Sequence, residues 1–203
     1  MSFYADRIMP RMIAAGMQNK AMRRHRPRIP PLARGLVLEV GIGSGLNLPY
    51  YGREVTRLFG LEPSGFLRSE AETAARSAPF PVELLSAGAE SIPLDSSSVD
   101  TVVSTWTLCS IPDLDAALGE IRRVLRPDGR LLFFEHGRAP DPSVSRWQDR
   151  LAPLFRGLAG CNPNRQIDAS ITSAGFRLTD IERAYLDGPR FISWHFIGQA
   201  VPA

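Results

Sequence analysis

The sequence of 203 residues predicts an α/β protein with an open, mostly parallel sheet, and three observations support this prediction. The aliphatic run 36–40 is typical of a buried strand, and it leads into three alternate glycines, Gly41, Gly43 and Gly45. A second apolar run, 55–61, ends at the acidic residue Glu62. Strand-like and helical patterns then follow each other along the chain, as in sheets whose strands are joined by helices.

The glycine-rich turn is expected to lie against a ligand, because glycines leave the backbone open to close approach. Glu62 follows the turn by about 20 positions, where a carboxylate at a strand tip accepts hydrogen bonds from both ribose hydroxyls. A dinucleotide site favours Gly-x-Gly-x-x-Gly, whereas here the third glycine comes one residue early and Glu39 precedes the turn. A carboxylate there would repel a pyrophosphate and suits a ligand with an ammonium group. The alternative is a glycine-rich connection that binds nothing.

Length and composition favour a single domain with a sizeable core, since 44% of the residues are hydrophobic. Cys109 and Cys161 lie far apart and show no metal-ligand or redox spacing, which indicates a reducing compartment. No metal is expected, because the histidines and acidic residues show no ligand cluster. No apolar run approaches the ~20 residues needed to cross a bilayer, and the start of the chain lacks a signal-peptide pattern. We therefore expect a cytoplasmic protein.

The first 35 residues carry eight of the 24 basic residues and the single acid Asp6, although the net charge of the chain is only +3. All five methionines also lie here, and their helical spacing predicts one helix over residues 4–22. Three interpretations remain open: a helix docked on the core, a basic contact with an anionic membrane surface, or a lid over the ligand site. As a lid, the helix would turn Tyr4 and Met12 toward an apolar substrate, with the proline-rich stretch 27–31 as a stiff link.

The rest of the chain is predicted to continue the alternation of helices and strands. Helices are expected over 65–77, 113–125, 145–158 and 166–174, and strands over 82–86, 98–106, 130–136, 176–183 and 191–201, the last two as an antiparallel hairpin. Glu135 and His136 end the strand 130–136, at the edge where open α/β sheets place their ligands. Neighbours on a strand point to opposite faces, so only one is expected to reach a substrate. His136 could act as a general base, or be bonded to Glu135 or to a loop.

The pattern Glu39-x-Gly41-x-Gly43-x-Gly45 resembles the first motif of class I S-adenosylmethionine-dependent methyltransferases. The resemblance implies a Rossmann-like fold with three layers, α/β/α, around a seven-stranded, mostly parallel sheet with an antiparallel final strand. It also implies S-adenosyl-L-methionine as cofactor and S-adenosyl-L-homocysteine as its product. Residues 1–35 would form a basic helical lid and linker, and residues 36–203 the S-adenosylmethionine-binding methyltransferase domain.

The same resemblance implies further contacts with the cofactor. Many members bind the adenine amino group with an acidic residue where this chain has Gly88, which leaves the backbone of Ala89 and the side chain of Glu90 for adenine. The stretch 105–108 corresponds to the loop beneath the methyl donor, and it lacks the Asn/Asp-Pro-Pro-Tyr typical of enzymes that methylate base amines. The implied cofactor-binding residues are Glu39, Gly41, Gly43, Gly45, Asn47, Glu62, Pro63, Gly88, Ala89, Glu90, Thr105 and Trp106.

Several short segments together resemble the methyltransferase-like 7 family and its bacterial relatives. They are the glycine motif with its strand, Thr107-Leu108-Cys109-Ser110, Glu135-His136, and Gly160-Cys161-Asn162 followed by Arg165. Animal members are similar to thiol methyltransferases held on membranes by an apolar N-terminal segment, where this chain has its basic, methionine-lined helix. The resemblance implies a small, fairly apolar methyl acceptor, with sulfur preferred over oxygen or nitrogen. The candidate catalytic residues are His136 and Glu135, and the candidate substrate-binding residues are Tyr4, Met12, Cys161, Asn162 and Arg165.

Other functions remain open at this point. A lipid-headgroup or quinone methyltransferase would use the basic N-terminal segment for peripheral contact with a membrane surface. A noncatalytic cofactor-binding module, or a methyltransferase acting on RNA, would share the glycine motif. The basic run has no aromatic residues interleaved with it, so no nucleic-acid partner is expected. The expected partner is a small-molecule methyl acceptor.

Overall fold

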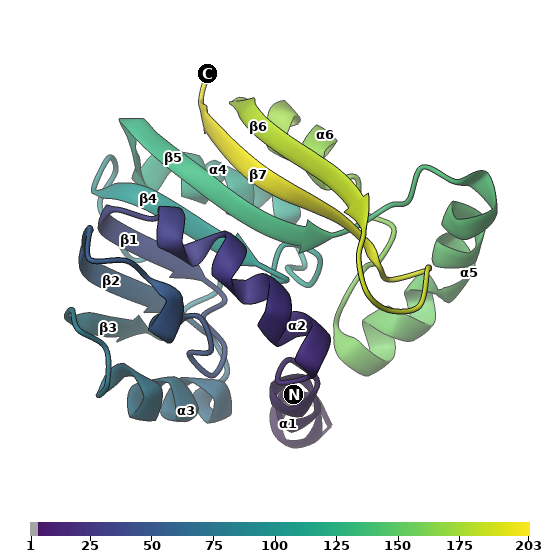
Figure 1. Ribbon diagram of the computed structural model, residues 1–203, viewed down its shortest axis with the longest axis horizontal. Coiled ribbons are helices and arrows are strands. Elements are labelled where there is room, and N and C mark those ends of the chain that lie inside the picture. Colours follow the sequence, from purple (N-terminus) through teal and green to yellow (C-terminus); the bar gives the residue numbers. More distant parts are fainter. Residues whose placement is uncertain (1–3) are drawn as a thin grey trace.

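The computed structural model describes residues 4–203, apart from the side chains of residues 5 and 6 (Figure 1). The strands are β1 (Gly35–Val40), β2 (Val55–Leu61), β3 (Val82–Leu85), β4 (Val99–Thr105), β5 (Leu125–His136), β6 (Phe176–Tyr185) and β7 (Trp194–Pro202). The α-helices are α1 (Met9–Gly16), α2 (Lys20–His25), α3 (Gly65–Ala75), α4 (Leu114–Val124), α5 (Pro142–Ala159) and α6 (Ile167–Ser173). Short turns of other helix types are η1 (Tyr4–Ile8), η2 (Arg26–Arg28), η3 (Pro30–Leu32) and η4 (Leu48–Tyr50).

The seven strands form one sheet in the order β3-β2-β1-β4-β5-β7-β6. Strands β1 to β5 pair in parallel, and β7 runs antiparallel between β5 and β6. The predicted fold class is therefore confirmed, including the antiparallel end of the sheet. Val40 pairs with Leu61 on one side and with Ser104 on the other. The strand order reverses beside β1, and in open sheets the crevice at such a reversal is where ligands bind.

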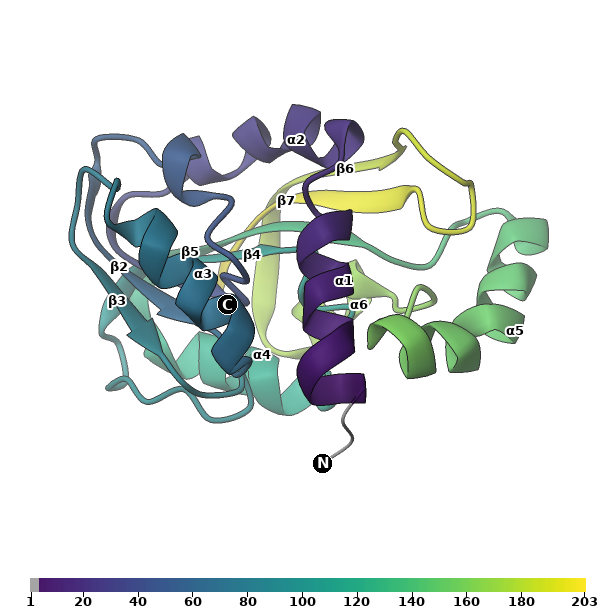
Figure 2. The same cartoon turned by 90° about the horizontal axis from the view of Figure 1, so that it is seen from below.

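Two hydrophobic layers cover the two faces of the sheet, because neighbouring residues on a buried strand point to opposite sides. Val37 packs in the cluster that contains Ile29 of the N-terminal segment and Ala71 of α3. Leu38 packs in the cluster that contains Leu118 of α4 and residues of α6. Figures 1 and 2 show α4 on one side of the sheet and α2 on the other. This arrangement is the predicted three-layer architecture.

The N-terminal segment differs from the single helix predicted over residues 4–22. It divides into η1 with α1 and then α2, with a break at 17–19. Gly16 is a poor helix former, and the Asn19 side chain accepts a hydrogen bond of 2.9 Å from the Met22 amide, which caps a new helix. The helical spacing of the methionines did not reveal this cap, so the prediction of one helix was wrong.

Smaller differences concern element boundaries and connections. The fifth strand begins at Leu125 rather than 130, with an irregular register opposite the segment between Val99 and Thr101. Between β1 and β2 the chain forms the short turn η4, which contacts η3 of the N-terminal segment. Within residues 4–203, no helix is both long enough and apolar enough to span a membrane.

Candidate cofactor and acceptor site

A cavity of ≈ 270 Å³ lies at the carboxyl ends of β1, β2 and β4. The glycine loop and the loop after β4 form two of its walls, and Ile13 and Ala14 of α1, with Met17 just after that helix, form another. Of the residues predicted to bind cofactor, all but Gly45 line it: Glu39, Gly41, Gly43, Asn47, Glu62, Pro63, Gly88, Ala89, Glu90, Thr105 and Trp106. The topology therefore brings four separate sequence segments to one cavity.

Gly45 does not line the cavity, in contrast to the prediction. It has φ +78°, and a Cβ at this position would lie 2.9 Å from the Cβ of Ala74. The third glycine of the motif thus permits close packing of the loop against α3. Gly41 must also be a glycine, because a Cβ at this position would lie 2.4 Å from the Thr107 side chain. Gly41 therefore lets the glycine loop approach the loop that follows β4.

Glu39 is a buried carboxylate in the cavity wall, with 1% of its surface exposed. Its Oε1 accepts a hydrogen bond of 2.6 Å from Asn47 Nδ2, and its Oε2 accepts one of 2.9 Å from the Tyr51 hydroxyl. Burial raises the pKa of Glu39 to about 7, although these two hydrogen bonds and nearby Arg26 oppose the shift. A cationic ligand in this cavity would favour the ionised form of the carboxylate.

Arg26 is the main cavity residue that the sequence analysis missed. It lies on η2, is 5% exposed and lines the cavity. Its Nη1 donates to Asn47 Oδ1 at 2.8 Å and its Nη2 to the Met17 carbonyl at 3.0 Å, while Nε has no hydrogen-bond partner among the described residues. Burial lowers the pKa of Arg26. Nothing in the local sequence distinguishes Arg26 from Arg23, because burial of one arginine in a basic run depends on the tertiary contacts.

Glu62 lies at the tip of β2, as predicted, and lines the cavity. Its Oε2 accepts a hydrogen bond of 3.2 Å from the Gly43 amide, and its Oε1 accepts one of 2.8 Å from the Ser64 amide. Burial raises the pKa of Glu62, and these two amides oppose the shift. The carboxylate therefore ties the glycine loop to the start of α3 and still faces the cavity.

Glu135 does not reach the cavity, in contrast to its prediction as a catalytic residue. Its side chain is fully buried, and its Oε1 accepts hydrogen bonds from Ser104 Oγ at 2.7 Å and from the Thr107 amide at 3.0 Å. It therefore supports the loop after β4. In that loop, Trp106 has φ +52°, and its indole lies 4.4 Å from the Phe134 ring centroid and donates to His195 Nε2 at 3.1 Å.

Asn162 and Arg165 were predicted to bind substrate, but the structure uses their polar groups to hold the same loop. The Asn162 amide nitrogens donate to the Cys109 carbonyl at 2.8 and 3.2 Å. The Arg165 guanidinium donates to the carbonyls of Leu108, Ile111 and Pro112. Neither side chain lines the cavity. The polar turn after α5 thus holds residues 108–112 through hydrogen bonds made outside the cavity.

Tyr4 and Met12 also lie elsewhere than predicted. The Tyr4 hydroxyl donates to the Leu158 carbonyl of α5 at 2.6 Å, and Met12 is 55% exposed. Neither lines the cavity, because α1 turns a different face toward it. The helix itself lines the cavity through Ile13 and Ala14.

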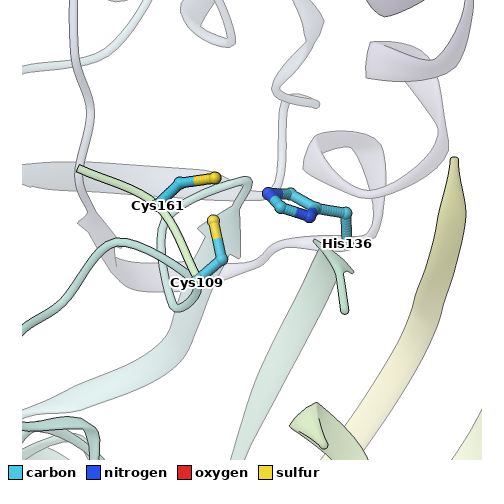
Figure 3. A group of neighbouring side chains, drawn as sticks. All are labelled: Cys109, His136 and Cys161. Atoms are coloured by element: carbon cyan, nitrogen blue, oxygen red, sulfur yellow. The ribbon is translucent and has the colours of Figure 1, made fainter. Parts of the chain in front are cut away.

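Cys109, His136 and Cys161 form a compact group (Figure 3). None of the three lines the cavity, in contrast to the predicted roles of His136 and Cys161, but Ser110 beside Cys109 does. One ring nitrogen of His136 and the two sulfurs all lie within 4.8 Å of one another. A hydrogen bond with the Cys161 thiol, together with His136, lowers the pKa of the Cys109 thiol. The same contact with Cys109, together with burial, raises the pKa of the Cys161 thiol. Burial alone would lower the pKa of His136, but the charge and hydrogen bond of Cys109 and the charge of Glu135 together outweigh burial and raise that pKa. The expectation that no ligand cluster forms is corrected here, because it considered only spacing along the chain.

The fold and the cavity can now be compared with known proteins. A methyltransferase-domain family model matches residues 38–133. Human thiol S-methyltransferase TMT1B is 32% identical over 177 residues, which cover 81% of this chain and 70% of that protein. Human thiol S-methyltransferase TMT1A is 32% identical over 185 residues, covering 84% and 72%. The crystal structure of a methyltransferase from Aquifex aeolicus superposes with a TM-score of 0.66 at 18% identity, over 96% of this chain and 98% of that one.

The sheet, its glycine loop and these comparisons define a class I S-adenosylmethionine-dependent methyltransferase, with S-adenosyl-L-methionine as its cofactor. Within this class, the chain belongs to the family of the thiol S-methyltransferases TMT1A and TMT1B. The residues present fit the cofactor, which carries an ammonium, a carboxylate and a ribose. The cavity offers the buried carboxylate of Glu39, the unpartnered Nε of Arg26 and the carboxylate of Glu62.

Proposed function

We propose that this enzyme transfers the methyl group of S-adenosylmethionine to a small, fairly apolar thiol. The observation that carries this proposal is the 32% identity over 81% of the chain to a thiol S-methyltransferase. The helix α1 supports the restriction to small acceptors, because it lies over the cavity with the apolar side chains of Ile13, Ala14 and Met17. We propose that residues 1–35 act as this lid and its linker, and that residues 36–203 hold the cofactor.

The charges in the cavity suggest an orientation for the cofactor. We propose that Glu39 faces the ammonium group and Arg26 the carboxylate, since both are buried side chains of the cavity wall. Glu62 would accept hydrogen bonds from the ribose hydroxyls, and the backbone at Ala89 with Glu90 would bind adenine. The N-terminal segment then takes part in cofactor binding through Arg26, in addition to covering the cavity.

The protein contributes mainly by positioning the two reactants. The bound cofactor supplies an electrophilic methyl group on a sulfonium. Fixing the acceptor about 3–3.5 Å from this carbon, in line with the bond that breaks, can supply several kcal/mol of the barrier. The loop of residues 105–112 is suited to this task, because Glu135, Asn162 and Arg165 hold it from behind. Trp106 and Thr107 of this loop line the cavity.

The proposal is tested by turnover of a labelled methyl donor with matched acceptors. An alkyl thiol, the corresponding alcohol and the corresponding amine share one apolar group and differ only in the nucleophile. We expect the thiol to be methylated at least ten times faster than the other two. Faster methylation of the alcohol or amine would contradict the choice of sulfur. A quinol and phospholipid vesicles complete the panel, and preferred turnover of either would support the membrane-surface alternative instead.

Glu39 should make cofactor binding depend on pH. The pKa of Glu39 is about 7 in the free protein, and pairing with the cofactor ammonium should lower this pKa in the complex. Between these two pKa values, binding requires loss of a proton, so affinity must fall as the pH falls. We expect the Kd to rise about fivefold from pH 7 to pH 6, because half of the free Glu39 is already protonated at pH 7. Calorimetry at several pH values measures this change, and Glu39→Gln should remove most of it. An unchanged slope in Glu39→Gln would assign the proton to another group.

A further inference from the structure

The group of Cys109, His136 and Cys161 assembles three side chains that commonly bind metals. They come from three places in the sequence: the loop after β4, the last residue of β5, and the turn after α5. Figure 3 shows the two thiols and the imidazole directed toward one another. The three ligand atoms lie within 4.8 Å of one another, whereas bonds of about 2.0–2.3 Å place tetrahedral zinc ligands about 3.3–3.8 Å apart, so the widest separation must close by about 1 Å or less. Small side-chain rotations would close this difference.

The three side chains of the group are buried or half-buried. Cys109 is 1% exposed, and its backbone carbonyl is held by Asn162. His136 Nδ1 is buried and has no hydrogen-bond partner in the described part of the chain. Figure 3 shows the other ring nitrogen, the one farther from the backbone, directed at the two sulfurs, so this nitrogen is the candidate ligand. The sulfurs and the imidazole are ligands that suit zinc, and the set provides three rather than four.

Three protein ligands leave one coordination position for an exchangeable molecule, as in catalytic zinc sites. The group lies beside the cofactor cavity: Ser110 lines the cavity, and its Oγ is 3.5 Å from Cys109 Sγ. The N-terminal segment that contains α1 lies close to both the cavity and this group. Met17, just after α1, lines the cavity. Met9, at the start of α1, packs beside Gly160, the neighbour of Cys161: its sulfur lies 3.6 Å from the position that a Cβ on Gly160 would take.

We propose that Cys109, His136 and Cys161 bind Zn²⁺, and that the acceptor thiol occupies the open coordination position. The second half of this proposal rests on the proposed function. Zinc deprotonates a coordinating thiol, so the acceptor would bind as a thiolate and release its proton to solvent. The Arg165 guanidinium, bonded to carbonyls on both sides of Cys109, offsets part of the negative charge of three sulfurs.

The transfer step then balances without any oxidant or reductant. The coordinated sulfur uses one of its electron pairs to form the new bond to the methyl carbon. The bond from that carbon to the cofactor sulfonium breaks, and its electrons remain on the departing sulfur. The products are a thioether and S-adenosyl-L-homocysteine. A neutral thioether is a weaker zinc ligand than a thiolate, so the product leaves and the position reopens.

Metal binding is tested on the full chain, reduced and freed of metal by a chelator, with ZnCl₂ as the only addition. Elemental analysis should show one zinc per chain, and competition with a chromogenic chelator gives the Kd. We expect Cys109→Ser, Cys161→Ser and His136→Ala each to weaken zinc binding on the order of 100-fold, at least the loss seen when second-shell partners of a metal are removed. His25→Ala is the matched control and should bind as the parent does. Thermal unfolding of the metal-free variants checks that each one folds.

Two results would overturn the zinc site itself. One is that the reduced parent binds less than a tenth of a zinc per chain. The other is equal zinc binding by the parent and Cys109→Ser. Co²⁺ in place of zinc provides an independent check, because thiolate ligation gives intense charge-transfer bands that His136→Ala should shift and Cys109→Ser should reduce.

Activity separates this proposal from the proposed function. If metal-free protein methylates thiols at the full rate, the role of zinc in binding the acceptor is refuted and thiol methylation stands. If the protein binds zinc but methylates only an alcohol or an amine, thiol methylation and the acceptor's place on zinc are both refuted. A rate that falls on chelation and returns with ZnCl₂, but not in Cys161→Ser, supports both proposals.

Discussion

Replacing Glu62 with alanine is expected to weaken binding of S-adenosylmethionine about 100-fold. In the proposed orientation, its carboxylate accepts two hydrogen bonds from the ribose, and bonds to a charged group contribute about 1.5–3 kcal/mol each. Glu62 is only 7% exposed, so water replaces it poorly. The variant also loses the bonds to the Gly43 and Ser64 amides, which loosens the glycine loop. Calorimetric titration with the cofactor and with S-adenosyl-L-homocysteine measures the loss.

Two controls separate loss of the ribose contact from general damage. Glu62→Gln keeps a similar shape and one acceptor oxygen, so its loss should be smaller, about tenfold. Glu72→Ala changes an exposed acid on α3 and should bind normally. A cofactor analogue without the 2′-hydroxyl should lose affinity for the parent and much less for Glu62→Ala. Normal cofactor binding by Glu62→Ala would show that the ribose lies elsewhere.

Replacing Arg26 with methionine is expected to weaken cofactor binding by a similar factor, about 100-fold. A buried guanidinium facing a carboxylate forms charge-assisted bonds, which are about twice as strong as neutral ones. Among the described residues, Nε of Arg26 has no hydrogen-bond partner, while its other nitrogens bond to Asn47 and to the Met17 carbonyl. The loss should be reproduced by Arg26→Lys only in part, because an ammonium cannot make the same set of bonds. Calorimetry at pH 7.5 measures the Kd values.

A cofactor analogue without the carboxylate is the most direct control for the proposed role of Arg26. Decarboxylated S-adenosylmethionine lacks the group that Arg26 is proposed to bind, so the parent and Arg26→Met should differ little with it. Arg23→Met removes an exposed arginine from the same basic run and should change neither affinity. Equal losses for both ligands in Arg26→Met would mean that Arg26 only holds the N-terminal segment in place.

The sheet and most of the cofactor cavity were predictable from local patterns. Buried parallel strands are continuous apolar runs, and their carboxyl ends meet at one edge of the sheet. Glu39, the glycine loop and Glu62 therefore had to converge once the strands were recognised. The prediction was less successful at Gly16–Asn19. The apolar spacing continues through this stretch, but the Asn19 cap ends one helix and begins another. It also misplaced Tyr4 and Met12, because spacing gives the faces of a helix and not the neighbour that each face meets.

The predicted substrate-binding residues show that a sequence motif does not fix the role of its side chains. Asn162 and Arg165 were recognised as a motif, but motifs do not reveal whether a polar group meets a ligand or a backbone carbonyl. Here the loop of residues 108–112 has carbonyls that need donors, and these two side chains supply them. These carbonyls need donors because of the conformation of the loop, and the motif residues alone do not predict that conformation.

The sequence by itself determined the class of fold, the position of the glycine loop and the two acids that flank it, because these depend on periodicity and on short spacings within strands and turns. Only the tertiary structure decided that Arg26 turns into the cavity while its basic neighbours stay outside. It likewise decided that Cys109, His136 and Cys161 meet. Such convergence depends on how whole elements pack against each other, and residues far apart in the chain carry no local record of that packing.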